Sequence, residues 1–204
     1  MTRFAPPRAA AAKAVWMGGV VMQKNGDDPA KVDGPRLSPH AEFVERASDH
    51  VRRMLKQGAP RHEVLARLAA AAEVLAGRGA VASILVLNEE GVLRNGASPN
   101  LPADYLTAID RLKPDASVGT CAAAAATGCV VETPDFRADD KWAELRHLPL
   151  SLGFVGAWSQ PIKSPEGRVL GTFGTYFRDR RQPTAAERNG VQRLAAAAAL
   201  VLAE

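Results

Sequence analysis

The chain has 204 residues, a formal net charge of +4 and 47% hydrophobic residues, a composition typical of a globular protein rather than a disordered or fibrous one. The charge excess lies in residues 1–60, with 10 Lys and Arg against 6 Asp and Glu, whereas residues 61–204 carry 16 of each. Because the basic residues are not interleaved with aromatic ones, we expect no nucleic-acid partner. Cys121 and Cys129 are too few for a disulfide scaffold and indicate reduced thiols in a cytoplasmic protein.

Residues 1–37 predict a disordered or loosely attached extension, because Pro and Gly recur there without hydrophobic periodicity. The apolar run at 14–22 is interrupted by two glycines and is shorter than the roughly 20 residues that span a bilayer. We therefore expect neither a signal peptide nor a membrane partner. Met17 or Met22 is an alternative translation start to Met1.

Two amphipathic helices are expected next. Ser38 and Pro39 are typical of a helix N-cap and first position, and apolar residues at 43–55 then fall on one face. The Gly-Ala-Pro sequence at 58–60 ends this helix, and a second apolar stripe at 64–75 predicts another. We assign residues 38–60 to an N-terminal helix that takes part in dimerisation, and residues 61–204 to the main domain.

The rest of the chain alternates between strand and helix patterns. The aliphatic run at 81–87 and the segment 92–97 predict a β-hairpin around the turn at 88–91. Thr184 and Glu187 form a capping box that begins the last helix. The other expected elements are helices at 103–112, 120–127 and 138–151, the last one broken or bent near Pro149, and strands at 129–132, 153–162 and 169–178.

This order of elements predicts an α+β fold. Hairpins imply an antiparallel sheet, and helices near both ends of the domain imply that they cover one face of it together. The middle segment, residues 99–153, then has to cross the opposite face. We call residues 99–153 the crossing segment and expect a pocket between it and the sheet.

Four short motifs occur in order along the domain: Gly-Thr-Cys-Ala-Ala-Ala at 119–124, Asp-Asp-Lys-Trp at 139–142, Ala-Trp-Ser-Gln-Pro-Ile at 157–162 and Leu-Gly-Thr-Phe-Gly at 170–174. With them, residues 61–204 resemble a GAF domain, the sensing module of bacterial signalling proteins. Ala122 and Ala157 depart from the glycine and the cysteine that are usual in that pattern. The resemblance implies a GAF-like antiparallel sheet, a small-molecule ligand, and terminal helices that signal to a kinase, cyclase, phosphodiesterase or DNA-binding domain.

A ligand pocket is predicted where these motifs meet. Cys121 begins a helix, where free N–H groups and the helix dipole favour an anion such as nitrate, or a lowered thiol pKa. The alternative is that Cys121 is a small buried side chain that packs on the sheet. Cys129 is expected in the core. The predicted ligand-binding residues are Thr120, Cys121, Trp142, Leu145, Ala157 and Trp158.

Catalysis and cofactor binding are less consistent with the sequence. GAF proteins that reduce free methionine sulfoxide carry a further cysteine in the crossing loop, and residues 133–142 contain none. His147 has no partner expected of an iron ligand, and a bilin would need a cysteine near it. We therefore expect no cofactor and no enzyme, with a thiol-dependent reductase as the alternative function.

The main hypothesis is a cytoplasmic sensor that binds a small molecule and forms a homodimer through helices at 38–58, 60–77 and 184–204. Its output is expected to pass to a separate signalling partner. A ligand-free dimerisation module, with Trp142 and Trp158 packed together where the pocket would be, is a third alternative.

Overall fold

The computed structural model describes residues 37–77 and 79–203. The predicted extension at 1–37 lies outside the described residues, apart from Leu37. Within the described ranges, no helix combines the length and hydropathy needed to cross a bilayer.

The centre of the fold is a five-stranded antiparallel sheet in the order β2-β1-β5-β4-β3. Its longest strand, β5, lies in the middle and pairs with β1 on one side and β4 on the other. This arrangement confirms the predicted α+β class. The strands are β1 (Val81–Leu87), β2 (Leu93–Ala97), β3 (Val131–Thr133), β4 (Gly156–Lys163) and β5 (Val169–Phe177).

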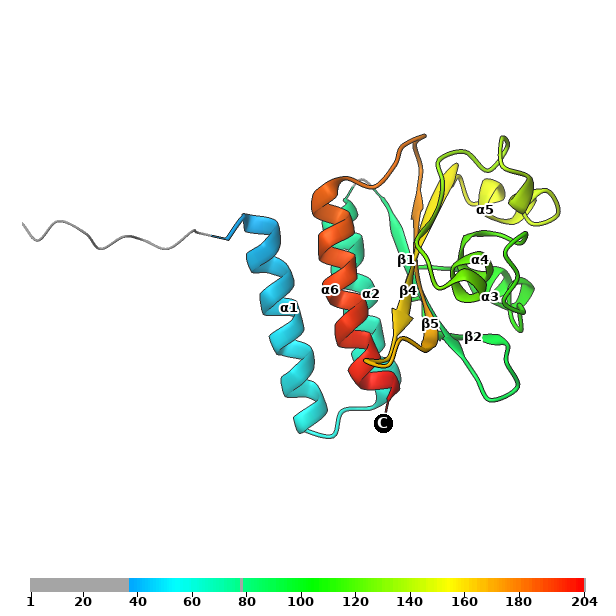
Figure 1. Ribbon diagram of the computed structural model, residues 1–204. Helices are drawn as coiled ribbons and strands as arrows, with labels where there is room; N and C mark the ends of the chain where they lie inside the picture. Colours follow the sequence, from blue (N-terminus) through cyan, green and yellow to red (C-terminus); the bar gives the residue numbers. More distant parts are fainter. Residues whose placement is uncertain (1–36, 78, 204) are drawn as a thin grey trace, which may run out of the picture. The chain divides into compact units, whose positions relative to one another are not determined.

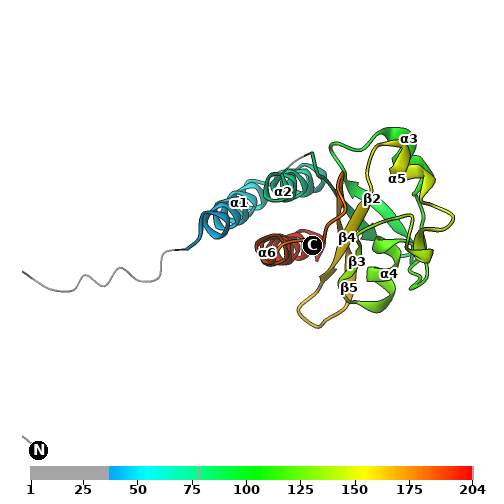
Figure 2. The same cartoon turned by 90° about the horizontal axis from the view of Figure 1, so that it is seen from above.

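Of the three long helices, the second and third along the chain cover one face of the sheet and the first packs on their outer side, while short elements of the crossing segment cover the other face (Figures 1 and 2). The long helices are α1 (Pro39–Lys56), α2 (Arg61–Ala76) and α6 (Ala185–Leu202). The crossing segment contains α3 (Ala103–Ala108), α4 (Thr120–Thr127), the 3₁₀ turn η1 (Asp140–Trp142) and α5 (His147–Ser151). We call the two sides of the sheet the helix face and the crossing face.

Two of the long helices, α1 and α6, begin at the capping residues that the sequence predicted. The Ser38 hydroxyl accepts a hydrogen bond from the Ala41 N–H, and Thr184 with Glu187 forms the complete capping box of α6. At the end of α4, Gly128 adopts a left-handed conformation with φ of 63°, which is favourable for glycine.

Two predicted elements differ from the structure. The helix expected at 138–151 is split into η1 and α5, because extended Asp139 caps the Lys141 N–H and begins a new turn there. The prediction that Cys129 lies in a core strand is wrong. The chain leaves α4 through the left-handed Gly128, Cys129 is exposed, and β3 begins only at Val131.

Two hydrophobic cores lie on opposite faces of the sheet. Since successive strand residues point to opposite sides, Trp158 and Phe177 join the helix-face core, while their neighbours Ala157 and Tyr176 join the crossing-face core. Alanine supplies much of the contact surface of α2 and α6 on the helix face. The strands thus contribute to two cores, one covered by long helices and the other by the crossing segment.

Candidate functional site

A small cavity lies in the crossing-face core, between the sheet, α3, the start of α4 and η1. Its volume is ≈ 20 Å³, in a measure by which one water molecule needs about 10–15 Å³. A ligand larger than water therefore requires the walls to move. The lining residues are Leu85, Tyr105, Ile109, Leu112, Val118, Gly119, Thr120, Cys121, Ala122, Trp142, Leu145 and Tyr176.

Gly119 shapes one wall of this cavity. Its φ of 51° and ψ of −173° belong to a region that is essentially restricted to glycine. The Gly119 N–H donates to the carbonyl oxygen of Lys141 over 2.7 Å. A Cβ at Gly119 would lie 3.7 Å from the nearest atom of the Trp142 ring. This turn therefore places η1 and its tryptophan against the start of α4.

Two polar atoms of the cavity residues have no hydrogen-bond partner within the described chain. They are Thr120 Oγ1 and Trp142 Nε1, and both are buried. A buried polar group without a partner costs about 1–3 kcal/mol. A molecule that supplied an acceptor for the indole N–H, or a partner for the hydroxyl, would recover part of this cost.

Two tyrosines form another part of the cavity wall. The Tyr105 hydroxyl donates to the Tyr176 hydroxyl over 3.1 Å, and their rings meet edge to face at 5.9 Å. Burial raises the pKa of both phenols well above the ordinary value of 10.0. Both hydroxyls are therefore neutral donors and acceptors at physiological pH.

Cys121 is buried against the sheet. Its Sγ accepts a hydrogen bond from the Ser159 hydroxyl over 3.3 Å, and a Cβ at Gly174 would lie only 2.9 Å from the sulfur. Burial raises the pKa of the thiol by more than the neighbouring hydroxyls of Ser159, Thr172 and Thr120 lower it. The interpretation of Cys121 as a buried packing residue is thus correct, and the lowered pKa considered for it is not found.

Four of the six predicted site residues line the cavity together: Thr120, Cys121, Trp142 and Leu145. Ala157 belongs to the same core without lining the cavity. The prediction that Trp158 shares this pocket is wrong, because it lies one residue after Ala157 on β4 and faces the helices. Consequently Trp142 and Trp158 are on opposite faces, and they do not fill one pocket together.

Sequence reasoning missed three side chains that shape the site: Tyr105, Tyr176 and Ser159. Strand alternation was the available signal for two of them. Ser159 shares the face of Ala157, and Tyr176 alternates with the helix-face residue Phe177. Tyr105 meets Tyr176 across 71 positions of sequence, a contact that no local pattern indicates.

Neither His147 nor Arg146 of the crossing segment lines the cavity. His147 is exposed, and Arg146 donates to the carbonyl oxygen of Arg137. Across residues 37–77 and 79–203, no three His, Cys, Asp or Glu side chains come together as metal ligands would.

Comparison with protein families gives a match to the GAF domain over residues 58–203. This chain belongs to the GAF domain family. Among curated proteins, the GAF region is 32% identical over 144 residues to the methyl sulfide methyltransferase-associated sensor of Methanosarcina acetivorans. The match covers 70% of this chain but only 14% of that sensor.

Solved structures share the fold. A GAF domain of a phosphoenolpyruvate-protein phosphotransferase from Coxiella burnetii has a TM-score of 0.64 at 14% identity, covering 81% of this chain and 95% of that one. Free methionine-R-sulfoxide reductase from Neisseria meningitidis has a TM-score of 0.62 at 19% identity, covering 80% and 88%. A domain of a sensor histidine kinase from Sinorhizobium meliloti has a TM-score of 0.56 at 21% identity, covering 68% and 87%. A domain of a sensor histidine kinase and a reductase are thus both structural neighbours.

Proposed function

We propose that this GAF domain is a cytoplasmic sensor that binds a small molecule in the cavity of the crossing face and signals through its terminal helices to a separate partner. The observation that carries the proposal is the pair of buried, unpartnered polar atoms, Thr120 Oγ1 and Trp142 Nε1, on residues that line one cavity. The relative from Methanosarcina acetivorans, which is named a sensor, supports the same role.

The cavity lining indicates the chemistry of the ligand. Its walls are largely aliphatic and aromatic, and its lining residues carry an indole N–H, a threonine hydroxyl, the paired tyrosine hydroxyls and a thiol as polar groups. A compact molecule with an apolar part and a hydrogen-bond acceptor fits this lining. A small anion such as nitrate is the alternative, since it would use the N-terminus of α4 together with the Trp142 N–H.

Native mass spectrometry of freshly purified protein tests the proposal. We expect a bound small molecule, and we expect Thr120→Val to reduce its occupancy by at least about threefold, because the substitution removes a hydroxyl and keeps the shape. Thr175→Val is the matched control, since Thr175 is equally buried and unpartnered on β5 but does not line the cavity. Equal occupancy in the wild type and both variants would contradict the proposed site. Calorimetry with nitrate then tests the anion, and absence of heat rejects it.

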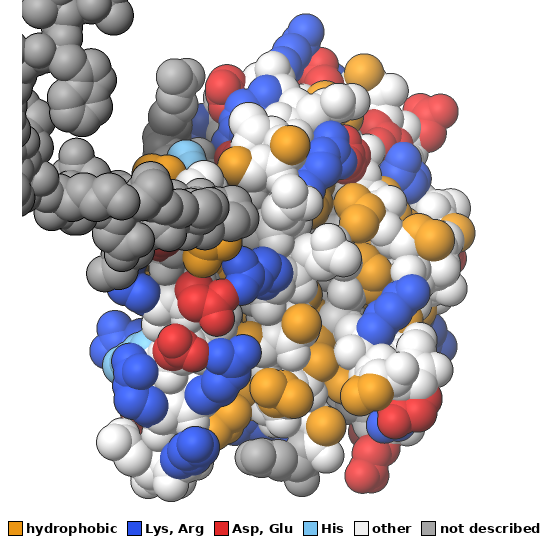
Figure 3. All heavy atoms as spheres, turned by 60° about the vertical axis from the view of Figure 1, so that its left-hand side comes forward, with side chains coloured by type: hydrophobic (Ala, Val, Ile, Leu, Met, Phe, Trp, Pro, Cys, Tyr) orange, Lys and Arg blue, Asp and Glu red, His pale blue; other side chains and the backbone are white. Residues whose placement is uncertain are grey.

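We propose further that the helices of the helix face form a homodimer. The outward surface of α6 carries Ala185, Ala196 and Leu200 as exposed apolar residues, and Leu200 is 52% exposed. Figure 3 shows the molecule turned so that the left-hand side of Figure 1 comes forward, with charged side chains at the left, at the top and at the lower right, and hydrophobic ones between them in the centre. Sedimentation analysis should give a dimer that Leu200→Glu weakens, while Val130→Glu, at an exposed position outside the three long helices, serves as the control.

A non-enzymatic role is part of the proposal. A thiol reductase needs a reactive thiolate, and the raised pKa of buried Cys121 favours the protonated thiol. Cys129 lies exposed just beyond the end of α4. We expect no NADPH-coupled reduction of free methionine sulfoxide. Activity that disappears in Cys121→Ser would establish the reductase instead.

A further inference from the structure

We propose that the first turn of α6 is the element that receives the signal from the cavity, because two polar clamps connect it through the sheet to two residues of the cavity wall, Tyr176 and Trp142. The inference rests on the proposed sensor function and specifies its output. The two clamps are defined by Arg181 with Glu187 and by Glu132 with Arg188. They hold adjacent residues of α6.

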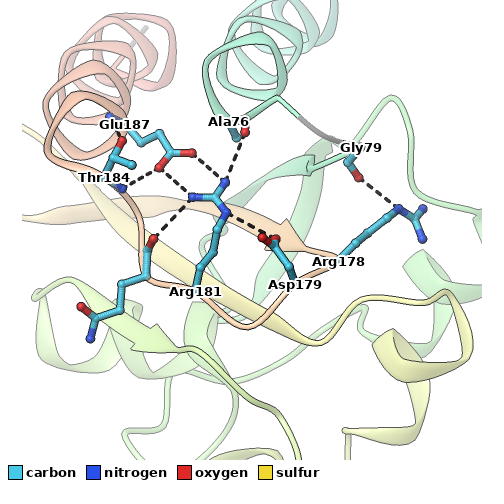
Figure 4. A network of polar contacts seen from close by, with 8 residues as sticks. Ala76, Gly79, Arg178, Asp179, Arg181, Thr184 and Glu187 are labelled. Atoms are coloured by element: carbon cyan, nitrogen blue, oxygen red, sulfur yellow. Dashed lines mark hydrogen bonds and ion pairs between the residues drawn. The ribbon is translucent and has the colours of Figure 1, made fainter.

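The first clamp joins three elements around Arg181 (Figure 4). Its guanidinium donates to both carboxylate oxygens of Glu187 over 2.7 and 2.8 Å, and to the carbonyl oxygen of Ala76 at the end of α2 over 3.2 Å. The same group lies 3.6 Å above the centre of the Phe177 ring. Glu187 also accepts from the Thr184 N–H over 2.6 Å. Arg181 therefore fixes the start of α6 to α2 and to the end of β5.

The end of β5 connects this clamp to the cavity. Phe177 lies under Arg181 on the helix face, and the preceding Tyr176 lines the cavity on the other face. Phe154 packs on Tyr176 at 5.5 Å, and Arg178 stacks on Phe154 while donating to the carbonyl oxygens of Gly79 and Leu152. A displacement of Tyr176 would therefore shift the backbone that positions Phe177.

The second clamp reaches α6 from the edge of the sheet. Arg188 forms an ion pair with Glu132 on the edge strand β3. The next residue, Thr133, is fully buried and donates to an Asp139 carboxylate oxygen over 2.6 Å. Neighbouring residues of one strand again face opposite sides, so β3 joins α6 to the crossing segment.

Asp139 completes the connection to the cavity. Its other carboxylate oxygen accepts from the Lys141 N–H and Nζ, and the Lys141 carbonyl accepts from the Gly119 N–H. Burial alone would raise the pKa of Asp139, but the hydrogen bonds from Lys141 and Thr133 outweigh it and lower the pKa. The carboxylate that positions η1 and Trp142 is thus ionised and held from two sides.

Because the cavity is small, a bound ligand would act on the residues that lead to the two clamps. At ≈ 20 Å³ it admits little more than one water molecule. A larger ligand must displace a wall, and the walls contributed by Tyr176 and by Trp142 lead to the two clamps. A ligand can bias a conformational equilibrium only through such differential contacts. We infer that binding changes the freedom of the first turn of α6.

Hydrogen exchange with a substituted cavity wall tests the inference without any ligand. Tyr105→Phe removes the hydroxyl pair from α3, which is not part of either clamp. We expect amide exchange at residues 188–191, the first α6 amides that are hydrogen-bonded to the preceding turn, to accelerate about fivefold, the factor that corresponds to one lost hydrogen bond. Residues 198–202 at the other end of α6 should not change.

A second experiment removes both clamps, to test whether they transmit the effect of the cavity wall to α6. In the background of Arg181→Met with Glu132→Gln, the additional effect of Tyr105→Phe on residues 188–191 should disappear. Arg193→Met is the matched control, because Arg193 is an α6 arginine paired with Glu45 of α1 and has no link to the cavity. Should the double variant fail to fold, Glu187→Gln with Arg188→Met replaces it.

Two outcomes would overturn the inference. One is an α6 that does not respond to Tyr105→Phe while α3 does, and the other is a response that persists without both clamps. Since neither readout needs a bound molecule, failure here is distinguishable from failure of the sensor proposal, which native mass spectrometry decides.

Discussion

The two faces of the sheet differ in what covers them. Helices of 16 to 18 residues pack on the helix face, whereas the helical elements of the crossing face have 3 to 8 residues. The helix-face core is mainly aliphatic, while the crossing face contains a tyrosine pair, a buried thiol and a cavity. Regions that adapt to ligands are drawn from the less stable parts of a fold. We therefore expect the helix face to be the more rigid side of the sheet and the crossing face the more adaptable one.

The largest expected effect is on the free energy of unfolding. It compares a core residue of the helix face with a residue of the cavity wall on the crossing face. Leu194 is fully buried in α6, so Leu194→Ala should lower the free energy of unfolding by about 2–5 kcal/mol. Leu145→Ala, in the partly exposed cavity wall, should cost about 1 kcal/mol or less. Urea denaturation of both variants measures the difference. Equal losses would show that the two faces do not differ in this way.

The second prediction concerns how the stability contributed by Glu187 on the helix face depends on pH. Burial alone would raise the pKa of Glu187, but hydrogen bonds from Arg181 and Thr184 outweigh it and hold the pKa below the ordinary 4.5. The stability contributed by this lowered pKa is present above about pH 4.5 and is lost as the pH falls through the folded-state pKa. We expect about 2 kcal/mol from these charge-assisted hydrogen bonds.

The measurement is the free energy of unfolding between pH 6 and pH 3, for the wild type and for Glu187→Gln. The variant should be less stable at pH 6, and its stability should fall less on acidification. Parallel pH curves would mean that Glu187 keeps an ordinary pKa in the folded protein.

A third prediction concerns the turn that shapes the cavity. Gly119→Ala should cost about 1–2 kcal/mol, because φ of 51° with ψ of −173° is unfavourable for any residue with a Cβ. Gly128→Ala, with φ of 63° and ψ of 19°, is the control that places alanine in the more accessible left-handed region. Thermal unfolding should rank Gly119→Ala as the less stable variant, and the reverse order would contradict the strained turn.

The smallest effect on stability is expected for substitution of a cysteine. The two cysteines are expected to differ in the reactivity of their thiols. An aromatic disulfide reagent should label exposed Cys129 within seconds to minutes and buried Cys121 only after unfolding. Cys129→Ser should remove the fast phase and leave stability within about 0.5 kcal/mol of the wild type. A fast phase that remains in Cys129→Ser would show that the crossing face opens readily.

Local signals in the sequence predicted most secondary structure. The bounds of β1 and α4, the Ser38 cap and the capping box of α6 depend on neighbours within four positions, so they are visible in the sequence. The hairpins and the placement of the helices then predicted the α+β class and the crossing segment. Of the predicted ligand-binding residues, Thr120, Cys121, Trp142 and Leu145 line the cavity, and that they bind a ligand stays a prediction.

Only the tertiary structure decided how distant segments meet. The sequence by itself determined that residues 81–87 form a strand and that a helix begins at Thr120. It did not determine that Tyr105 bonds Tyr176, or that Arg181 reaches Ala76 across 105 positions. Trp158 was misplaced because a strand residue has the same local pattern on either face, and only the packing of the helices selects the side. Contacts of this kind depend on three-dimensional packing rather than on local preference, and they form both the cavity and the clamps.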